Sequence, residues 1–219
     1  MHMLIAATVL IALLGPIQTP AGQSAAEVAA AVQRKYDQMK DFSADFTQTH
    51  TGGPLGRKRV EQGAVVIKRP GRMRWEYKSP EKKLFVSNGK RLVFHDPGNN
   101  QVTLSEMPEG DDATSAALFL TGRGNLTRDF NVSFLPNAAA DTYALKLEPK
   151  RRQTDFDWLE LVVDRQTLQL RTLTAIAREA GRDSFAFSSV KENVGAADKI
   201  FEFEIPRGAE VIHAGRGKS

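Results

Sequence analysis

Apolar and polar residues alternate in one short segment after another along most of this 219-residue chain, starting at Phe42. Successive side chains of a β-strand point to opposite faces, so a period of two predicts strands with one buried face. About ten such segments follow one another at hairpin spacing, with Gly, Pro, Asn and Asp between them. This spacing is typical of an antiparallel sheet, barrel or sandwich, and the chain is expected to be mainly β.

Two of these expected strands meet at Asn88-Gly89, a dipeptide that strongly favours a tight hairpin. We expect Leu84 and Val86 before the turn to pair with Leu92 and Phe94 after it. The last expected strand contains Phe201, Phe203 and Ile205 and ends before Pro206.

Two segments differ from the strand pattern and predict helices. Ser24 and Glu27 have the spacing of a capping box, and Val28, Val32 and Tyr36 then recur at helical intervals, so a helix should run to about Lys40. Residues 111–121 are Ala-rich with acidic residues first, which predicts a short helix ending at Gly122. That helix could plug one face of the sheet or simply connect two strands.

The N-terminal segment has the features of an export signal. Residues 3–14 are almost wholly apolar, too short to span a membrane, and small residues follow to Ala21. We expect residues 1–21 to be a signal peptide cleaved after Ala21, residues 22–212 to form one domain, and residues 213–219 to be a disordered tail. An uncleaved anchor and a buried N-terminal helix are the alternatives.

No catalytic motif is found. The chain has no cysteine, which excludes disulfides, thiol nucleophiles and zinc–thiolate sites, and its four histidines show no metal-binding spacing. Its serines lack the glycine context of a nucleophile elbow, so we do not expect an enzyme. The net charge of +4 includes basic clusters at residues 57–59 and 150–152, but export makes nucleic acid a poor partner.

One stretch carries a family resemblance. Residues 63–77, GAVVIKRPGRMRWEY, resemble the signature of the periplasmic outer-membrane lipoprotein carrier (LolA) family, and Phe46-Thr47-Gln48 resembles its Phe-x-Gln. The order and spacing of residues 80–96 and of residues 201–211 also fit, so the resemblance covers nearly all of the expected mature chain.

The resemblance implies an unclosed antiparallel β-barrel, a half-barrel of about ten or eleven strands, with an N-terminal helix and a short helical lid over an apolar cavity. It implies a periplasmic chaperone that takes triacylated lipoproteins from an inner-membrane ABC transporter complex and delivers them to the outer membrane, to a receptor lipoprotein if present. A monomer without cofactor or metal is expected. The alternative is a periplasmic lipid-binding or lipoprotein-sensing module on the same half-barrel.

The resemblance also implies site residues. Arg69 matches a family arginine that can latch the lid through backbone carbonyls, although a strand-end arginine that reaches water is the alternative. Trp75 corresponds to an aromatic that faces the cavity, and Met73 to an apolar contact for the lid or the transporter. Leu118, Phe119 and Leu120 are the lid candidates. The candidates for the cavity wall, each of which could equally be ordinary core, are Phe46, Val65, Ile67, Leu84, Val86, Leu92 and Phe94.

Overall fold

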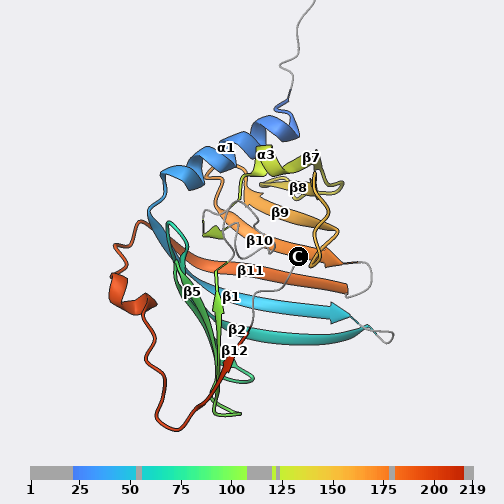
Figure 1. Ribbon diagram of the computed structural model, residues 1–219. Helices are drawn as coiled ribbons and strands as arrows, with labels where there is room; N and C mark the ends of the chain where they lie inside the picture. Colours follow the sequence, from blue (N-terminus) through green and yellow to red (C-terminus); the bar gives the residue numbers. More distant parts are fainter. Residues whose placement is uncertain (1–21, 53–55, 108–119, 122–123, 178–180, 215–219) are drawn as a thin grey trace, which may run out of the picture.

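A computed structural model describes residues 22–52, 56–107, 120–121, 124–177 and 181–214 of the chain. Within this part, one large sheet curves strongly, and helix α1 (Ala25–Gln38) lies across one end of it (Figure 1). The expected signal segment, residues 1–21, lies outside the described residues.

The strands follow one another along the chain with few interruptions. In chain order they are β1 (Asp41–Gly52), β2 (Arg57–Lys68), β3 (Arg72–Ser79), β4 (Lys83–Asn88), β5 (Arg91–Asp96), β6 (Gln101–Glu106), β7 (Phe130–Phe134), β8 (Thr142–Pro149), β9 (Trp158–Asp164), β10 (Leu170–Ala177), β11 (Gly181–Glu192) and β12 (Glu210–His213). Two short helical segments complete the described elements, α3 (Leu126–Asp129) and the 3-10 helix η1 (Asp198–Phe201).

These strands form a single twelve-stranded sheet in the order β12-β6-β5-β4-β3-β2-β1-β11-β10-β9-β8-β7. Neighbours are antiparallel except β12 and β6, which are parallel. The terminal strands β12 and β7 do not pair with each other, so the sheet remains open. The prediction of a mainly β, unclosed antiparallel barrel with an N-terminal helix is confirmed, but the described sheet has twelve strands and not the expected ten or eleven.

Helix α1 begins as its sequence predicts. The backbone N–H of Ser24 donates to the Glu27 carboxylate at 2.7 Å, and the Glu27 N–H donates to the Ser24 hydroxyl at 3.3 Å. This capping box satisfies two backbone donors that the first turn leaves free. Val28, Val32 and Tyr36 lie on the buried side of the helix, and the helix ends at Gln38, close to the expected Lys40.

The two faces of the sheet have different cores. The face that packs against α1, here called the inner face, carries the larger apolar cluster, which extends over most of the strands. The opposite, outer face carries a small cluster of Val86, Val93 and Val102. The C-terminal segment covers this outer cluster, since Phe203 and Ala209 pack against it.

That C-terminal segment differs from the prediction. Residues 198–201 form a 3-10 turn and residues 202–206 are extended without a strand partner, so the strand expected at Phe201 to Ile205 is wrong. The last strand is β12, where His213 pairs with Leu104, and the Ala214 N–H donates to the Leu104 carbonyl at 2.9 Å. Strand β12 therefore continues one residue beyond the expected domain end at 212.

Among the described residues, no helix has the length and apolar character needed to cross a membrane.

Candidate functional site

The centre of the inner face is built by register. Phe46 of β1 lies opposite Gly63 of β2, and Gly63 lies opposite Tyr77 of β3. Val65 lies opposite Trp75 by the same pairing. Four of the expected wall and cavity residues, Phe46, Val65, Ile67 and Trp75, thus share one buried apolar face, each at most 4% exposed.

Aromatic rings gather around Trp75. The ring of Phe46 lies 5.1 Å from Trp75 and 4.9 Å from Tyr77, both in edge-to-face geometry. From β11, Phe185 and Phe187 lie 5.3 Å and 6.2 Å from Trp75. Such pairs add stabilisation beyond the area that they bury. Phe46 and Trp75 are buried, whereas Phe185 and Phe187 are partly exposed, so the cluster opens toward β11.

The prediction for β4 and β5 is half wrong. Leu92 and Phe94 lie on the inner face, where Phe94 stacks on Phe85 at 4.5 Å. Leu84 and Val86 point to the outer face instead, because they pair with His95 and Val93 and pack with the outer cluster. They therefore do not line the inner face, and Phe85 stands in their place.

Three inner-face aromatics, Phe85, Phe185 and Phe187, were not among the expected wall residues. Phe185 and Phe187 were expected in a strand, and only the pairing of β11 with β1 shows that this strand borders Phe46. The turn contained the signal for Phe85. Ser87 pairs with Leu92 across a turn of four residues, 88–91. A turn with an even number of residues pairs odd-numbered residues of β4 with even-numbered residues of β5, so Phe85, and not Leu84 or Val86, shares a face with Leu92 and Phe94.

Arg69 follows β2 directly and joins that strand to α1. Its Nη1 donates to Asp37 Oδ1 at 3.2 Å, and its backbone N–H donates to the Lys40 carbonyl at 2.9 Å. Nη2 is buried without a hydrogen-bond partner among the described residues. Burial lowers the pKa of this guanidinium, while Asp37 acts in the opposite direction. The described partner is therefore an α1 carboxylate, not a carbonyl of the expected lid.

The expected lid is described only at its end. Leu118 and Phe119 lie outside the described residues, whereas Leu120 is fully buried in the inner cluster. The carbonyl of the next residue, Thr121, accepts from the Gly71 N–H at 3.0 Å, which attaches this segment beside Arg69. Met73, expected as a partner or lid contact, is 5% exposed in the same cluster.

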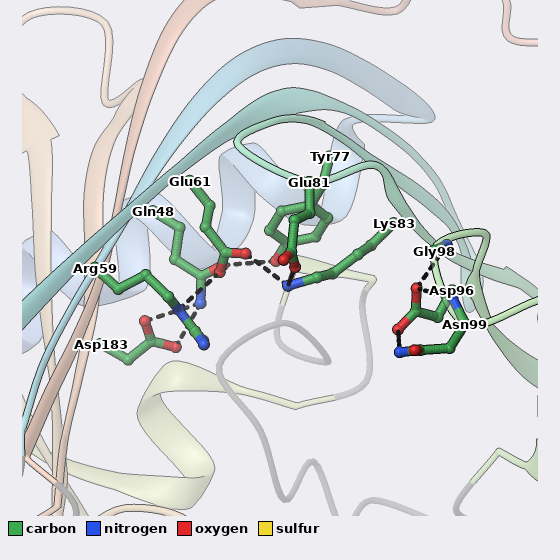
Figure 2. A network of polar contacts seen from close by, with 10 residues as sticks. All are labelled: Gln48, Arg59, Glu61, Tyr77, Glu81, Lys83, Asp96, Gly98, Asn99 and Asp183. Carbon is green, nitrogen blue, oxygen red and sulfur yellow. Dashed lines mark hydrogen bonds and ion pairs between the residues drawn. The ribbon is translucent and has the colours of Figure 1, made fainter. Parts of the chain in front are cut away.

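A polar network occupies the inner face toward the ends of β1 and β2 that meet at Gly52 and Arg57 (Figure 2). The Tyr77 hydroxyl donates to Gln48 Oε1 at 2.7 Å, and Gln48 Nε2 donates to both carboxylate oxygens of Asp183 at 2.9 Å. Burial raises the pKa of Asp183.

The same network contains a buried ion pair. Lys83 Nζ lies 2.8 Å from Glu61 Oε1, and Arg59 Nε lies 3.4 Å from the other oxygen. The Glu61 side chain is only 6% exposed, and its hydrogen bond raises the pKa of Lys83. The inner face is therefore divided into an apolar aromatic region and a polar region whose groups are paired with one another.

The outer face has a depression of a different kind. It has a volume of about 240 Å³, and among its lining residues are Arg74, Glu76, Lys78, Lys82 and His95. Five of its nine lining residues are charged, so an acyl chain placed there would lie against several charged groups. Among the described residues, no group of His, Asp and Glu is arranged to hold a metal ion.

Comparisons with known proteins agree with the geometry. The family described as "Outer membrane lipoprotein carrier protein LolA" matches residues 37–204. An outer-membrane lipoprotein carrier protein of Nitrosomonas europaea is 32% identical over 178 residues, 78% of this chain and 82% of that protein. One of Coxiella burnetii is 29% identical over 175 residues, 80% of this chain and 81% of that protein.

A crystal structure supports the fold. An uncharacterized conserved protein from Thermus thermophilus superposes with a TM-score of 0.53 at 13% identity, covering 86% of this chain and 99% of that chain.

Proposed function

We propose, from the premise that this chain belongs to the outer-membrane lipoprotein carrier (LolA) family, that it is a periplasmic chaperone for lipoproteins. It binds the acyl chains of lipoproteins released from the inner membrane and delivers them to the outer membrane. The observation that carries this proposal is the curved, open sheet with a large apolar and aromatic region on its inner face.

The physical need for such a face follows from the cargo. Each methylene moved from water into apolar surroundings contributes about 0.8 kcal/mol, so exposed acyl chains would hold a lipoprotein in the membrane or aggregate it. A carrier has to replace the membrane with an apolar surface of its own. Trp75, Phe46 and Val65, with the partly exposed Phe185 and Phe187, supply that surface beside β11.

The residues proposed to contact acyl chains are those on the inner face, which differ from the wall residues predicted from the sequence. Leu84 and Val86 are left out because they belong to the outer cluster. The proposed contacts are Phe46, Val65, Ile67, Trp75, Phe85, Leu92, Phe94, Phe185 and Phe187.

Arg69 is proposed as the latch between the sheet and what covers it. Its Nη1 bonds to Asp37 of α1, and its Nη2 is a buried donor that has no partner among the described residues. An unmade bond of a buried charged group is costly, so a carbonyl of the covering segment, which reaches the sheet beside Arg69 at Thr121, would be stabilised there. Cargo binding would break these bonds, and cargo release would let them form again.

The partners proposed for this cycle are the inner-membrane ABC transporter complex and an outer-membrane receptor lipoprotein, with the carrier acting as a monomer and without enzymatic activity. Met73 is 5% exposed, so it contacts a partner only if the side chains packed against it in the inner cluster move away. Residues 1–21 are proposed to direct export and to be removed.

The test is release of a lipoprotein from spheroplasts. Spheroplasts making a radiolabelled lipoprotein are incubated with the purified protein, and the soluble fraction is analysed for a one-to-one complex. A complex is expected, and its transfer to outer-membrane vesicles should slow in Arg69→Leu and be unchanged in Arg91→Leu, which replaces an exposed arginine on β5. If the folded protein leaves all label in the spheroplasts, it is not a carrier.

A further inference from the structure

Trp75 carries a polar atom that the fold does not use. Its side chain lies on the inner face and the residue is 4% exposed, yet its indole Nε1 has no hydrogen-bond partner among the described residues. About nine in ten buried polar groups in proteins are hydrogen-bonded, and an unpaired buried donor costs about 1–3 kcal/mol. An unpaired donor at the centre of a binding face therefore calls for an explanation.

Among the described residues, the side chains around Trp75 give its N–H no strong acceptor. The rings of Phe46, Phe185 and Phe187 surround it, and ring faces accept hydrogen bonds only weakly. On the same face, Gln48 Oε1 accepts from Tyr77 and Gln48 Nε2 donates to Asp183, and Gln48 makes no hydrogen bond with Trp75 Nε1. The N–H of Trp75 is thus a free donor inside an apolar cluster.

The indole nitrogen is buried, so a ligand would reach it only where its covering side chains can move aside, and the least buried of these lie on β11. Phe185 and Phe187 are only partly buried, and both rings lie within 6.2 Å of Trp75. A molecule lying against these two rings would come to Trp75 along β11 without passing through the strand layer. The site therefore suits a ligand that is apolar over most of its length and carries a hydrogen-bond acceptor but needs no donor.

We propose that the Trp75 indole N–H donates a hydrogen bond to an acyl carbonyl oxygen of the cargo, an ester or amide carbonyl at the head of an acyl chain. This inference rests on the proposed carrier function and adds a positioning residue to it. Acyl chains joined through a carbonyl have the required character, because the carbonyl accepts and the rest is apolar. The bond would fix how far each chain extends along the inner face and would favour acyl over alkyl lipids.

Trp158 provides a matched control within the same molecule. It is the second of the two tryptophans in the chain, and its Nε1 is likewise buried and unpartnered among the described residues. It lies on the outer face, since Leu159 and Leu161 point inward, and Lys146 sits 4.9 Å above its ring. A ligand on the inner face should leave Trp158 unaffected.

The experiment compares two lipids that differ in the carbonyl. The full chain, labelled with ¹⁵N in its tryptophans, is titrated with dipalmitoylglycerol or with its ether analogue, di-O-hexadecylglycerol, both dispersed in mild detergent. Trp75→Phe and Trp158→Phe assign the two indole N–H signals. The ester should move the Trp75 signal downfield and leave that of Trp158 in place, and the ether should produce no such downfield shift.

Affinity provides the second readout. The ester should bind roughly three- to tenfold more tightly than the ether, the worth of one net hydrogen bond. Trp75→Phe should abolish this preference, whereas Trp158→Phe should keep it. Equal binding of the two lipids, or a preference that survives in Trp75→Phe, would overturn the inference and leave the carrier function standing. If neither lipid binds the native protein, both proposals fail.

Discussion

Replacing Gly63 by alanine tests how the aromatic cluster is packed. Gly63 lies between Phe46 and Tyr77 across the β1–β2–β3 ladder. A Cβ added at this position would come within 2.2 Å of the Glu76 carbonyl oxygen and 2.7 Å of the Phe46 ring. Both distances are far below van der Waals contact, and the carbonyl belongs to the neighbouring backbone, which cannot rotate away.

The expected cost is at the upper end for an overpacked site. Forcing extra atoms into a packed core costs typically 1–3 kcal/mol, and the backbone contact places Gly63→Ala at about 3 kcal/mol. For a domain of this size 1 kcal/mol shifts the melting temperature by roughly 2–4 °C, so a decrease of about 6–12 °C is expected. Circular dichroism during heating measures the melting temperature.

Two further variants make the reasoning refutable. At Gly98 an added Cβ meets only the Asp96 side chain, at 3.3 Å, so Gly98→Ala should melt close to the native protein. Gly63→Ala combined with Phe46→Leu should recover part of the loss, because one of the two obstructions is removed. A Gly63→Ala protein that melts within about 2 °C of the native one has lost less than about 1 kcal/mol, which would refute the packing argument.

Three other predictions concern the inner face. Phe85→Gln should weaken binding of a fluorescent fatty-acid probe roughly tenfold, whereas Leu84→Gln on the outer face should leave the probe affinity unchanged; the opposite order would reverse the face assignment. Burial raises the folded-state pKa of Asp183, so the stability of the native protein falls as the pH rises above the unfolded pKa of about 3.9. Asp183→Asn should therefore be more stable than the native protein at pH 7 and lose this advantage below about pH 4. Urea unfolding at each pH measures the difference. Lys83→Met should cost about 3 kcal/mol by leaving the Glu61 carboxylate buried beside Arg59 alone, and adding Glu61→Gln should restore much of the loss in the same urea assay.

Local sequence signals predicted the elements well because local physics decides them. The capping box at Ser24 and the apolar stripe to Tyr36 fix α1, and alternation fixes strands such as β9, where Leu159 and Leu161 are buried. The polar network was not predictable in this way. Glu61, Lys83 and Asp183 come from three strands, and only the register of the sheet brings their side chains together.

The C-terminal region shows where alternation misleads. Phe201 and Phe203 alternate with polar residues as a strand would, but the segment is a 3-10 turn followed by extended chain without a ladder partner. Period two reports an extended chain with one buried side and does not report hydrogen bonding. Phe203 buries its side against the outer cluster, and Lys68 holds η1 in place through Asp198 at 2.6 Å.

The run Leu84-Phe85-Val86 bears on two wrong predictions, the inner-face position of Leu84 and Val86 and the strand at residues 201–205. Three consecutive apolar residues in a strand indicate burial on both faces, because neighbouring side chains point in opposite directions. Phe85 is covered on the inner side by Phe94, and Val86 on the outer side by the segment that carries Phe203. A strand buried on both faces requires a second covering layer, and the C-terminal segment is the part of the chain that supplies it. Because that segment covers the outer face of β4, the inner face is the side on which this strand can meet an apolar ligand.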